Sequence, residues 1–252
     1  MQLKQELAAA KASAGAGAAD DAADVVDFTG ETPPILGYWK IRGLAAPIRY
    51  MFYQLGVHFS DVTYDTGDAP DYDKSSWLDV KQTLGLEYPN LPYLIDENNG
   101  VKLTETVAIM QYIAKKYRPS LCGTSAAEVG RISMLLDKVT TLKGKSTVAC
   151  YTVGDAEAII EECRPMLAKI VEVMGGSDWI AGPNLSWLDF YFAENLDMLN
   201  AISDGLFYAE FPSLQTYWDR FIALPNLCDA WANDDLLMKA PFNNKMAKLL
   251  NN

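Results

Sequence analysis

Residues Ile35–Leu44 read ILGYWKIRGL, and they mark the point where a strand passes into a helix. The apolar start predicts a strand that runs into the turn Gly37-Tyr38-Trp39, with a helix that begins soon after Gly43. A helix is expected over Ala46–Leu55, because Pro47 falls in its first turn, where a missing backbone N–H costs little. The sequence therefore places a tyrosine hydroxyl at the C-terminal end of the first strand.

The pattern of a small mixed sheet continues after this helix. Three further strands are expected, at Asp61–Tyr64, Pro92–Asp96 and Val101–Leu103. The turn Asn98-Asn99-Gly100 is typical of a hairpin between the last two strands, and a helix is expected over Val107–Tyr117. The resulting order, βαβ, a short helix and then ββα, predicts an α/β thioredoxin-like domain over residues 34–120.

Strand patterns stop after residue 120. Five helical patterns follow, at Ala126–Ala149, Ala156–Met174, Trp187–Ile202, Pro212–Leu224 and Pro225–Met238. They predict an all-α domain over residues 124–252, in which Ser186 and Asp189 form a capping box at the start of the third helix. Residues 1–33 are rich in Ala, Gly and Asp, which is typical of a flexible tail. The tail is either a solvated extension or a tether to a partner.

Composition excludes several classes of function. The net charge of -12 argues against a nucleic-acid or anionic membrane surface, which needs a basic patch. With His58 as its one histidine, the chain lacks the material for Ser-His-Asp catalysis or a His-rich metal site, and no metal is expected. Its four cysteines form no C-x-x-C pair, which speaks against a zinc ribbon or a dithiol redox site. No segment reaches the roughly 18 apolar residues of a membrane span, so we expect a cytoplasmic protein.

The GYWKIRGL run that starts at Gly37 resembles the opening of mu-class glutathione transferases. Three more blocks resemble that family in the same order, at residues 68–78, 88–94 and 103–107, and the likeness spans roughly residues 34–240. The resemblance implies a homodimeric transferase that joins the glutathione thiolate to a hydrophobic electrophile, with glutathione as co-substrate and no other cofactor. Without it, each block has a plain structural explanation: a core tyrosine, a solvated loop, a turn into a strand, and a helix cap.

Tyr38 is the catalytic residue that the resemblance implies. The glutathione thiol titrates near 8.5 in water, so most of it is protonated at neutral pH. A hydrogen bond to the charged form lowers that pKa, and the thiolate is the nucleophile. In the family, the tyrosine at this position donates such a hydrogen bond to the glutathione sulfur.

A wider set of residues is implied to bind glutathione. In the family's pattern, Trp77 and Lys81 would donate to the glycine carboxylate. A cis Pro92 would turn the backbone of Leu91 toward the cysteinyl unit, as an added strand does. The implied glutathione-binding set is Tyr38, Trp39, Leu44, Lys74, Trp77, Lys81, Asn90, Leu91, Pro92, Glu105 and Thr106.

Three of these positions depart from the mu pattern. Lys74 stands where the family usually has arginine, so the planar bidentate fork is lost. Glu105 and Thr106 replace the usual Gln-Ser pair, although a helix N-terminus there still suits the γ-glutamyl carboxylate and Glu105 would meet the ammonium.

The resemblance also assigns roles outside the glutathione site. Tyr151 would line the pocket for the electrophile, together with a helical C-terminal segment near Phe242. Tyr88 would enter the partner subunit of a two-fold symmetric dimer. The family's cross-subunit aspartate is Thr141 here. The sequence leaves two alternatives open: a glutathione-dependent isomerase, and a non-catalytic glutathione-binding scaffold.

Overall fold

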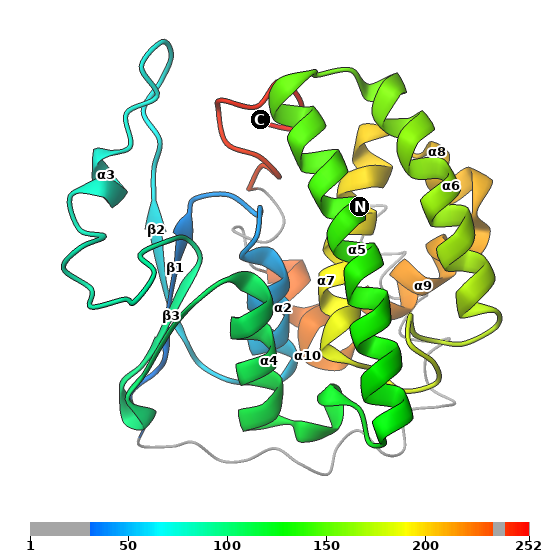
Figure 1. The fold of residues 1–252 in the computed structure, drawn as a ribbon, viewed down its shortest axis with the longest axis horizontal. Coiled ribbons are helices and arrows are strands. Elements are labelled where there is room, and N and C mark those ends of the chain that lie inside the picture. Colours follow the sequence, from blue (N-terminus) through cyan, green and yellow to red (C-terminus); the bar gives the residue numbers. More distant parts are fainter. Residues whose placement is uncertain (1–30, 234–239, 252) are drawn as a thin grey trace.

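The computed structural model describes residues 31–233 and 240–251 (Figure 1). Most of the tail expected over residues 1–33 lies outside these ranges, as do residues 234–238 of the last predicted helix. The boundaries proposed between the domains, at residues 33 and 120–124, stay predictions.

A four-stranded sheet forms the first half, in the order β2-β1-β3-β4. The strands are β1 (Ile35–Trp39), β2 (Ser60–Tyr64), β3 (Tyr93–Asp96) and β4 (Val101–Thr104). Strand β1 runs parallel to β2 and antiparallel to β3, and β3 pairs with β4 as a hairpin. All four strands were predicted to within two residues at each end, because their apolar stretches are bounded by turn residues.

Helices α2 (Ala46–Gln54) and α4 (Thr106–Tyr117) lie between this sheet and the second half of the chain (Figure 1). Helix α2 makes the crossover from β1 to β2, which parallel strands require. Two short elements flank the second pair of strands: α3 (Ser75–Leu78) and the 3-10 turn η2 (Glu97–Asn99). The predicted thioredoxin-like α/β fold of the first half is confirmed.

The second half is helical, as predicted. A 3-10 turn, η3 (Pro119–Cys122), leads into α5 (Ala126–Thr152), α6 (Ala156–Met174), α7 (Trp187–Ile202), α8 (Leu206–Glu210), α9 (Pro212–Ile222) and α10 (Pro225–Asn233). Helix α7 contacts α2, α5, α6 and α9 and is buried on nearly all sides. The short helix α8 was not predicted, because five residues carry too little periodicity to detect.

The predicted capping box fixes the start of α7. The Asp189 carboxylate is fully buried and accepts hydrogen bonds from the backbone N–H groups of Ser186 (2.8 Å) and Ile180 (2.9 Å). It also accepts one from the Tyr217 hydroxyl on α9, at 3.0 Å. A single carboxylate therefore caps α7 and joins it to its neighbours in the helical domain.

A buried ion cluster joins the two halves. The Arg42 guanidinium, in the turn between β1 and α2, lies 2.6 Å from carboxylate oxygens of both Glu194 and Asp197 on α7. The Tyr50 hydroxyl on α2 donates to Glu194 at 2.6 Å. The turn that follows β1 is therefore anchored directly to the centre of the helical domain.

Candidate active site

The turn after β1 fits closely around Tyr38. Gly43 has a φ of +47°, and a Cβ atom built on it would lie 2.7 Å from both Cε1 and the hydroxyl oxygen of Tyr38. Only glycine satisfies both the backbone conformation and this close approach. The Tyr38 ring, 6% exposed, is thus held between its strand and the turn that follows it.

The hydroxyl of Tyr38 is set up as a hydrogen-bond donor. Burial raises the pKa of Tyr38, and the backbone N–H of Leu44, which donates to the hydroxyl, opposes that rise only in part. The phenol therefore stays protonated at neutral pH. Because the oxygen already accepts the Leu44 N–H, its own proton is the group left to donate to an anion placed beside it.

The N-terminus of α4 lies against the same turn. Thr106, the first residue of α4, donates through Oγ1 to the carbonyl of Leu44 at 3.2 Å. The N–H groups in the first turn of a helix have no partner within it and carry a partial positive charge, so this end suits a carboxylate. The predicted residues Tyr38, Leu44 and Thr106 are brought together here.

Glu105 adopts a strained backbone conformation just before α4. Its φ is +70° and its ψ 118°, values that non-glycine residues rarely adopt and that often occur at ligand sites. Asn90 donates through Nδ2 to Glu105 Oε1 at 3.4 Å, so these two predicted residues also meet. The exposed side chains of Asn90 and Glu105 mark the open side of the site.

The Leu91–Pro92 peptide bond is cis, as predicted. Tyr93 pairs with Gly37 across the antiparallel β1–β3 register, so the residues just before it lie next to the C-terminal end of β1. A Cβ atom at Gly37 would lie 2.1 Å from the Tyr93 ring, which shows how closely the two strands approach. The backbone of Leu91 is thereby placed near Tyr38.

Trp77, Lys81 and Lys74 lie on and around α3. Trp77 is 5% exposed, with its ring stacked on Tyr93 at a centroid distance of 6.0 Å. Lys74 and Lys81 are half-buried, and neither forms an ion pair with another residue in the described part of the chain. The aromatic stack therefore connects α3 to β3, and the two lysines are joined to Trp77 by backbone hydrogen bonds, from the Trp77 N–H to the Lys74 carbonyl and from the Lys81 N–H to the Trp77 carbonyl, each 3.0 Å long.

Tyr151 lies at the end of α5 and meets the C-terminal segment. The backbone N–H of Asn244 donates to its hydroxyl at 3.1 Å, and burial raises the pKa of Tyr151. The carbonyls of Pro241 and Phe242 accept hydrogen bonds from the N–H groups of the turn after β1, at 2.9 and 3.0 Å. The segment thus joins Tyr151 to the turn beside Tyr38. It follows a course of turns, not the helix that was expected near Phe242.

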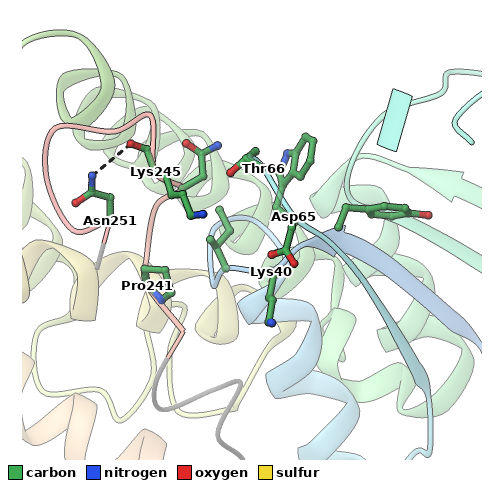
Figure 2. A pocket seen from close by; sticks show the side chains of 10 residues that line it. Lys40, Asp65, Thr66, Pro241, Lys245 and Asn251 are labelled. Atoms are coloured by element: carbon green, nitrogen blue, oxygen red, sulfur yellow. Dashed lines mark hydrogen bonds between the residues drawn. The ribbon is translucent and has the colours of Figure 1, made fainter. Parts of the chain in front are cut away.

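A cavity of about 100 Å³ lies between this segment and the sheet domain, and Figure 2 shows the side chains that line it. Lys40, Asp65 and Thr66 from the sheet domain line one side, facing Pro241, Lys245 and Asn251. Of the predicted site residues, Trp39 lines this cavity. A second cavity of about 160 Å³ is lined in part by Tyr88 and Glu105, so those two residues border one hollow.

Two arginines of the site were missed from the sequence. Arg42 forms the ion cluster with α7, and Arg49 donates through Nη1 to the carbonyl of Ile41 at 2.9 Å while its Nε lies 2.7 Å from Asp61 on β2. Both arginines are buried. The signal that could have found them is a charged residue within an apolar stretch, because a buried arginine requires a partner. The partners themselves are distant in sequence.

Two classes of site can be set aside for the residues that the structure describes. No group of three or more His, Cys, Asp and Glu side chains among them could hold a metal ion. Within the same ranges, no helix has the length and apolar character to cross a bilayer.

A thioredoxin-like domain with a buried tyrosine hydroxyl at the end of its first strand, joined to an all-helical domain, is the arrangement that the resemblance to glutathione transferases predicts. The comparisons agree. A family model described as the glutathione S-transferase N-terminal domain matches residues 34–115, and one described as the C-terminal domain matches residues 146–233.

The chain is 38% identical to human glutathione S-transferase Mu 3, over 86% of this chain and 96% of that protein. It is 36% identical to mouse glutathione S-transferase Mu 5, over 85% and 94% of the two chains. The crystal structure of the glutathione S-transferase Blo t 8 has a TM-score of 0.78 at 27% identity, covering 86% of this chain and 99% of that one. The protein belongs to the glutathione S-transferase family and resembles its mu class.

The close fit of Gly43 gives the first testable prediction. Gly43→Ala should force the Tyr38 ring away, and a misplacement of that size should lower glutathione conjugation by roughly 10²-fold. Gly100→Ala is the matched control, because Gly100 also has a positive φ (+62°) but nothing within 4 Å of the added Cβ. Both variants should lose about 1–2 kcal/mol of unfolding free energy in urea titrations. Equal activity in the two variants would contradict the steric explanation.

Proposed function

We propose that this protein conjugates the glutathione thiolate to hydrophobic electrophiles, with glutathione as its co-substrate. The observation that carries the proposal is the Tyr38 hydroxyl. It is buried, protonated and already accepting a hydrogen bond from Leu44, and it is placed beside the N-terminus of α4 and the cis Leu91–Pro92 bond. A donor in that setting stabilises an anion without becoming one.

The tripeptide would lie along the end of β1. Its γ-glutamyl carboxylate fits the N-terminus of α4 with the Thr106 hydroxyl, and the exposed Glu105 carboxylate fits its ammonium. The cysteinyl unit would pair with the backbone of Leu91 as an added strand. We propose that the buried Trp77 and the half-buried Lys81 donate to the glycine carboxylate, and the remaining proposed contacts are Trp39, Leu44, Lys74, Asn90 and Pro92.

Catalysis then rests on charge stabilisation. The bound thiol loses its proton to solvent water, and the Tyr38 O–H donates a hydrogen bond to the sulfur, which lowers the pKa of the thiol. The thiolate attacks the electrophilic carbon, a C–S bond forms, and the leaving group departs with the bonding pair. Because the donor is already in place and largely buried, little reorganisation is needed at the moment of reaction.

Tyr151 is the proposed contact for the electrophile. Its hydroxyl accepts the Asn244 N–H and so keeps its own proton available for negative charge that develops on the electrophile. The C-terminal segment around Phe242 would complete that side of the pocket, which agrees with its hydrogen bonds to the turn after β1.

Tyr38→Phe tests the central role. The variant should bind glutathione with nearly the same dissociation constant, because the tripeptide is held mainly at its two carboxylates and its backbone. Its conjugation to a generic aryl halide should fall by roughly 10²-fold, the loss seen when one donor to a developing charge is removed. Equal losses of affinity and turnover would argue against the thiolate role. Wild-type protein that binds glutathione but conjugates nothing would favour an isomerase or a scaffold.

Lys81→Ala tests the proposed site for the glycine carboxylate. Loss of a charge-assisted hydrogen bond should weaken glutathione binding by about 1–3 kcal/mol, measured by titration calorimetry. Lys169→Ala is the control, because Lys169 is an exposed lysine on α6 that pairs with Glu172. An unchanged dissociation constant in Lys81→Ala would remove this lysine from the site.

We also propose a homodimer, with Tyr88 at its interface. Tyr88 is 76% exposed in the single chain, although it is a large aromatic residue. Tyr88→Ala should therefore shift the protein toward monomer in sedimentation velocity, whereas Leu206→Ala, a half-exposed apolar residue on α8, should not. A wild-type protein that sediments as a monomer at micromolar concentration would contradict the proposal.

The setting proposed for this chemistry is the cytoplasm, with neither nucleic acid nor membrane as a partner. All four cysteines are free thiols, and a reducing compartment keeps them so. The proposed tether through residues 1–33 lies almost wholly outside the described residues.

A further inference from the structure

Arg42 lies between the proposed catalytic residue and the helical domain. It follows Tyr38 by four residues and precedes Leu44 by two, and it is 6% exposed. Its Nη2 atom lies 2.6 Å from oxygens of both Glu194 and Asp197 and 2.9 Å from the Tyr50 hydroxyl. A single guanidinium thus contacts α2 and two consecutive turns of α7.

Aromatic rings and backbone hold the same residue from the other side. The guanidinium carbon lies 3.9 Å from the centroid of the Phe242 ring and 5.6 Å from that of Trp231. The Arg42 backbone N–H donates to the carbonyl of Pro241 at 2.9 Å. The planar, delocalised cation of arginine suits this combination of ring stacking and paired carboxylates, and a lysine cannot reproduce it.

The backbone that leaves Arg42 reaches Tyr38 within two residues. Gly43 touches the Tyr38 ring, and the Leu44 N–H donates to the Tyr38 hydroxyl. Wherever the Arg42 side chain is fixed, the position of the Leu44 N–H is therefore restricted as well. The turn that Arg42 anchors therefore lies against both the ring and the hydroxyl oxygen of Tyr38.

We propose that Arg42 is a positioning residue for the transferase reaction. By anchoring the turn after β1 to α7, it keeps the Leu44 N–H on the Tyr38 hydroxyl and so aims the Tyr38 proton at the glutathione sulfur. The inference rests on the proposed function of Tyr38. It makes the thiolate depend on contacts in the helical domain, at Glu194 and Asp197, although Tyr38 itself lies in the sheet domain.

Arg49 supports the same turn in a different way. It holds the carbonyl of Ile41 and pairs with Asp61 of β2, so both of its partners belong to the sheet domain. Arg42 is the arginine of this turn whose carboxylate partners lie on α7. A test must therefore weaken the contacts of Arg42 with α7 and leave the contacts of Arg49 unchanged.

The test uses Arg42→Lys in the full-length chain. This variant keeps the positive charge, so Glu194 is not left without a cation, but it loses the guanidinium group, whose Nη2 atom reaches both carboxylates while its carbon lies over the Phe242 ring. Circular dichroism and urea unfolding check that it folds. Calorimetry gives its affinity for glutathione, and the ultraviolet absorbance of the bound thiolate, titrated with pH, gives the pKa of the bound thiol.

The expected result is a glutathione dissociation constant within about threefold of wild type and a bound-thiol pKa about one pH unit higher. In a Tyr38→Phe background, Arg42→Lys should leave the thiol pKa unchanged, because its effect passes through the Tyr38 hydroxyl. Arg131→Lys is the matched control: Arg131 is a half-buried arginine that donates to the Val173 carbonyl on α6, and its loss should not move the thiol pKa.

Two results would overturn the inference. One is an unchanged thiol pKa in folded Arg42→Lys. The other is an equal rise with and without Tyr38, which would mean that the charge acts directly on the sulfur. If Arg42→Lys does not fold, Asp197→Asn loosens the same anchor at a partly exposed carboxylate and should raise the thiol pKa by a smaller amount. A wild-type protein that binds glutathione but shows no thiolate absorbance would contradict the proposed function itself. That result differs from the two above, which contradict only the role of Arg42.

Discussion

The contact between the Tyr38 ring and the backbone at Gly43 is the constraint on which the rest of the site depends. A turn this close to an aromatic ring leaves no room for a Cβ atom, and it brings the Leu44 N–H onto the tyrosine hydroxyl. The carbonyl of Leu44 then receives the Thr106 hydroxyl, which aligns the N-terminus of α4 with the same point. Tyr38 and the N-terminus of α4 thus contact the same short piece of backbone.

The turn after β1 is held by buried charged side chains, and burying charge costs free energy. Removing Arg42, Glu194 and Asp197 from water carries a desolvation penalty that their mutual attraction only partly offsets. Such a cluster adds little net stability, yet loss of one partner leaves an unpaired charge in the core. The cluster is better explained by the geometry that it imposes. Its ion pairs form in a single orientation of the sheet domain relative to α7, whereas apolar contacts alone tolerate small displacements between the two. In our proposal, this single orientation fixes the position of the Tyr38 side chain.

Whether a feature could be predicted from the sequence depended on how far apart its interacting residues lie along the chain. Strand β1 and the capping box of α7 were predicted, because each depends on residues within a few positions of one another, and the cis Leu91–Pro92 bond was predicted from the family resemblance. The pairing of Arg42 with Glu194 was not, since the two lie 152 residues apart. The course of residues 240–251 was missed for the same reason: backbone hydrogen bonds to distant turns fix it, and these leave no periodic pattern.

Glu105 shows why a departure from the family's usual residue need not remove the site. Its backbone, at φ +70°, sets the direction of the chain as it enters α4, and this geometry belongs to the turn and not to the side chain. The Asn90 amide donates to Oε1 of Glu105, an oxygen that a glutamine would present at the same place. The carboxylate therefore keeps the hydrogen bond and adds a negative charge. That charge favours an ammonium group nearby, which is what the proposed binding of the γ-glutamyl end of glutathione requires, while the Thr106 hydroxyl remains in contact with Leu44.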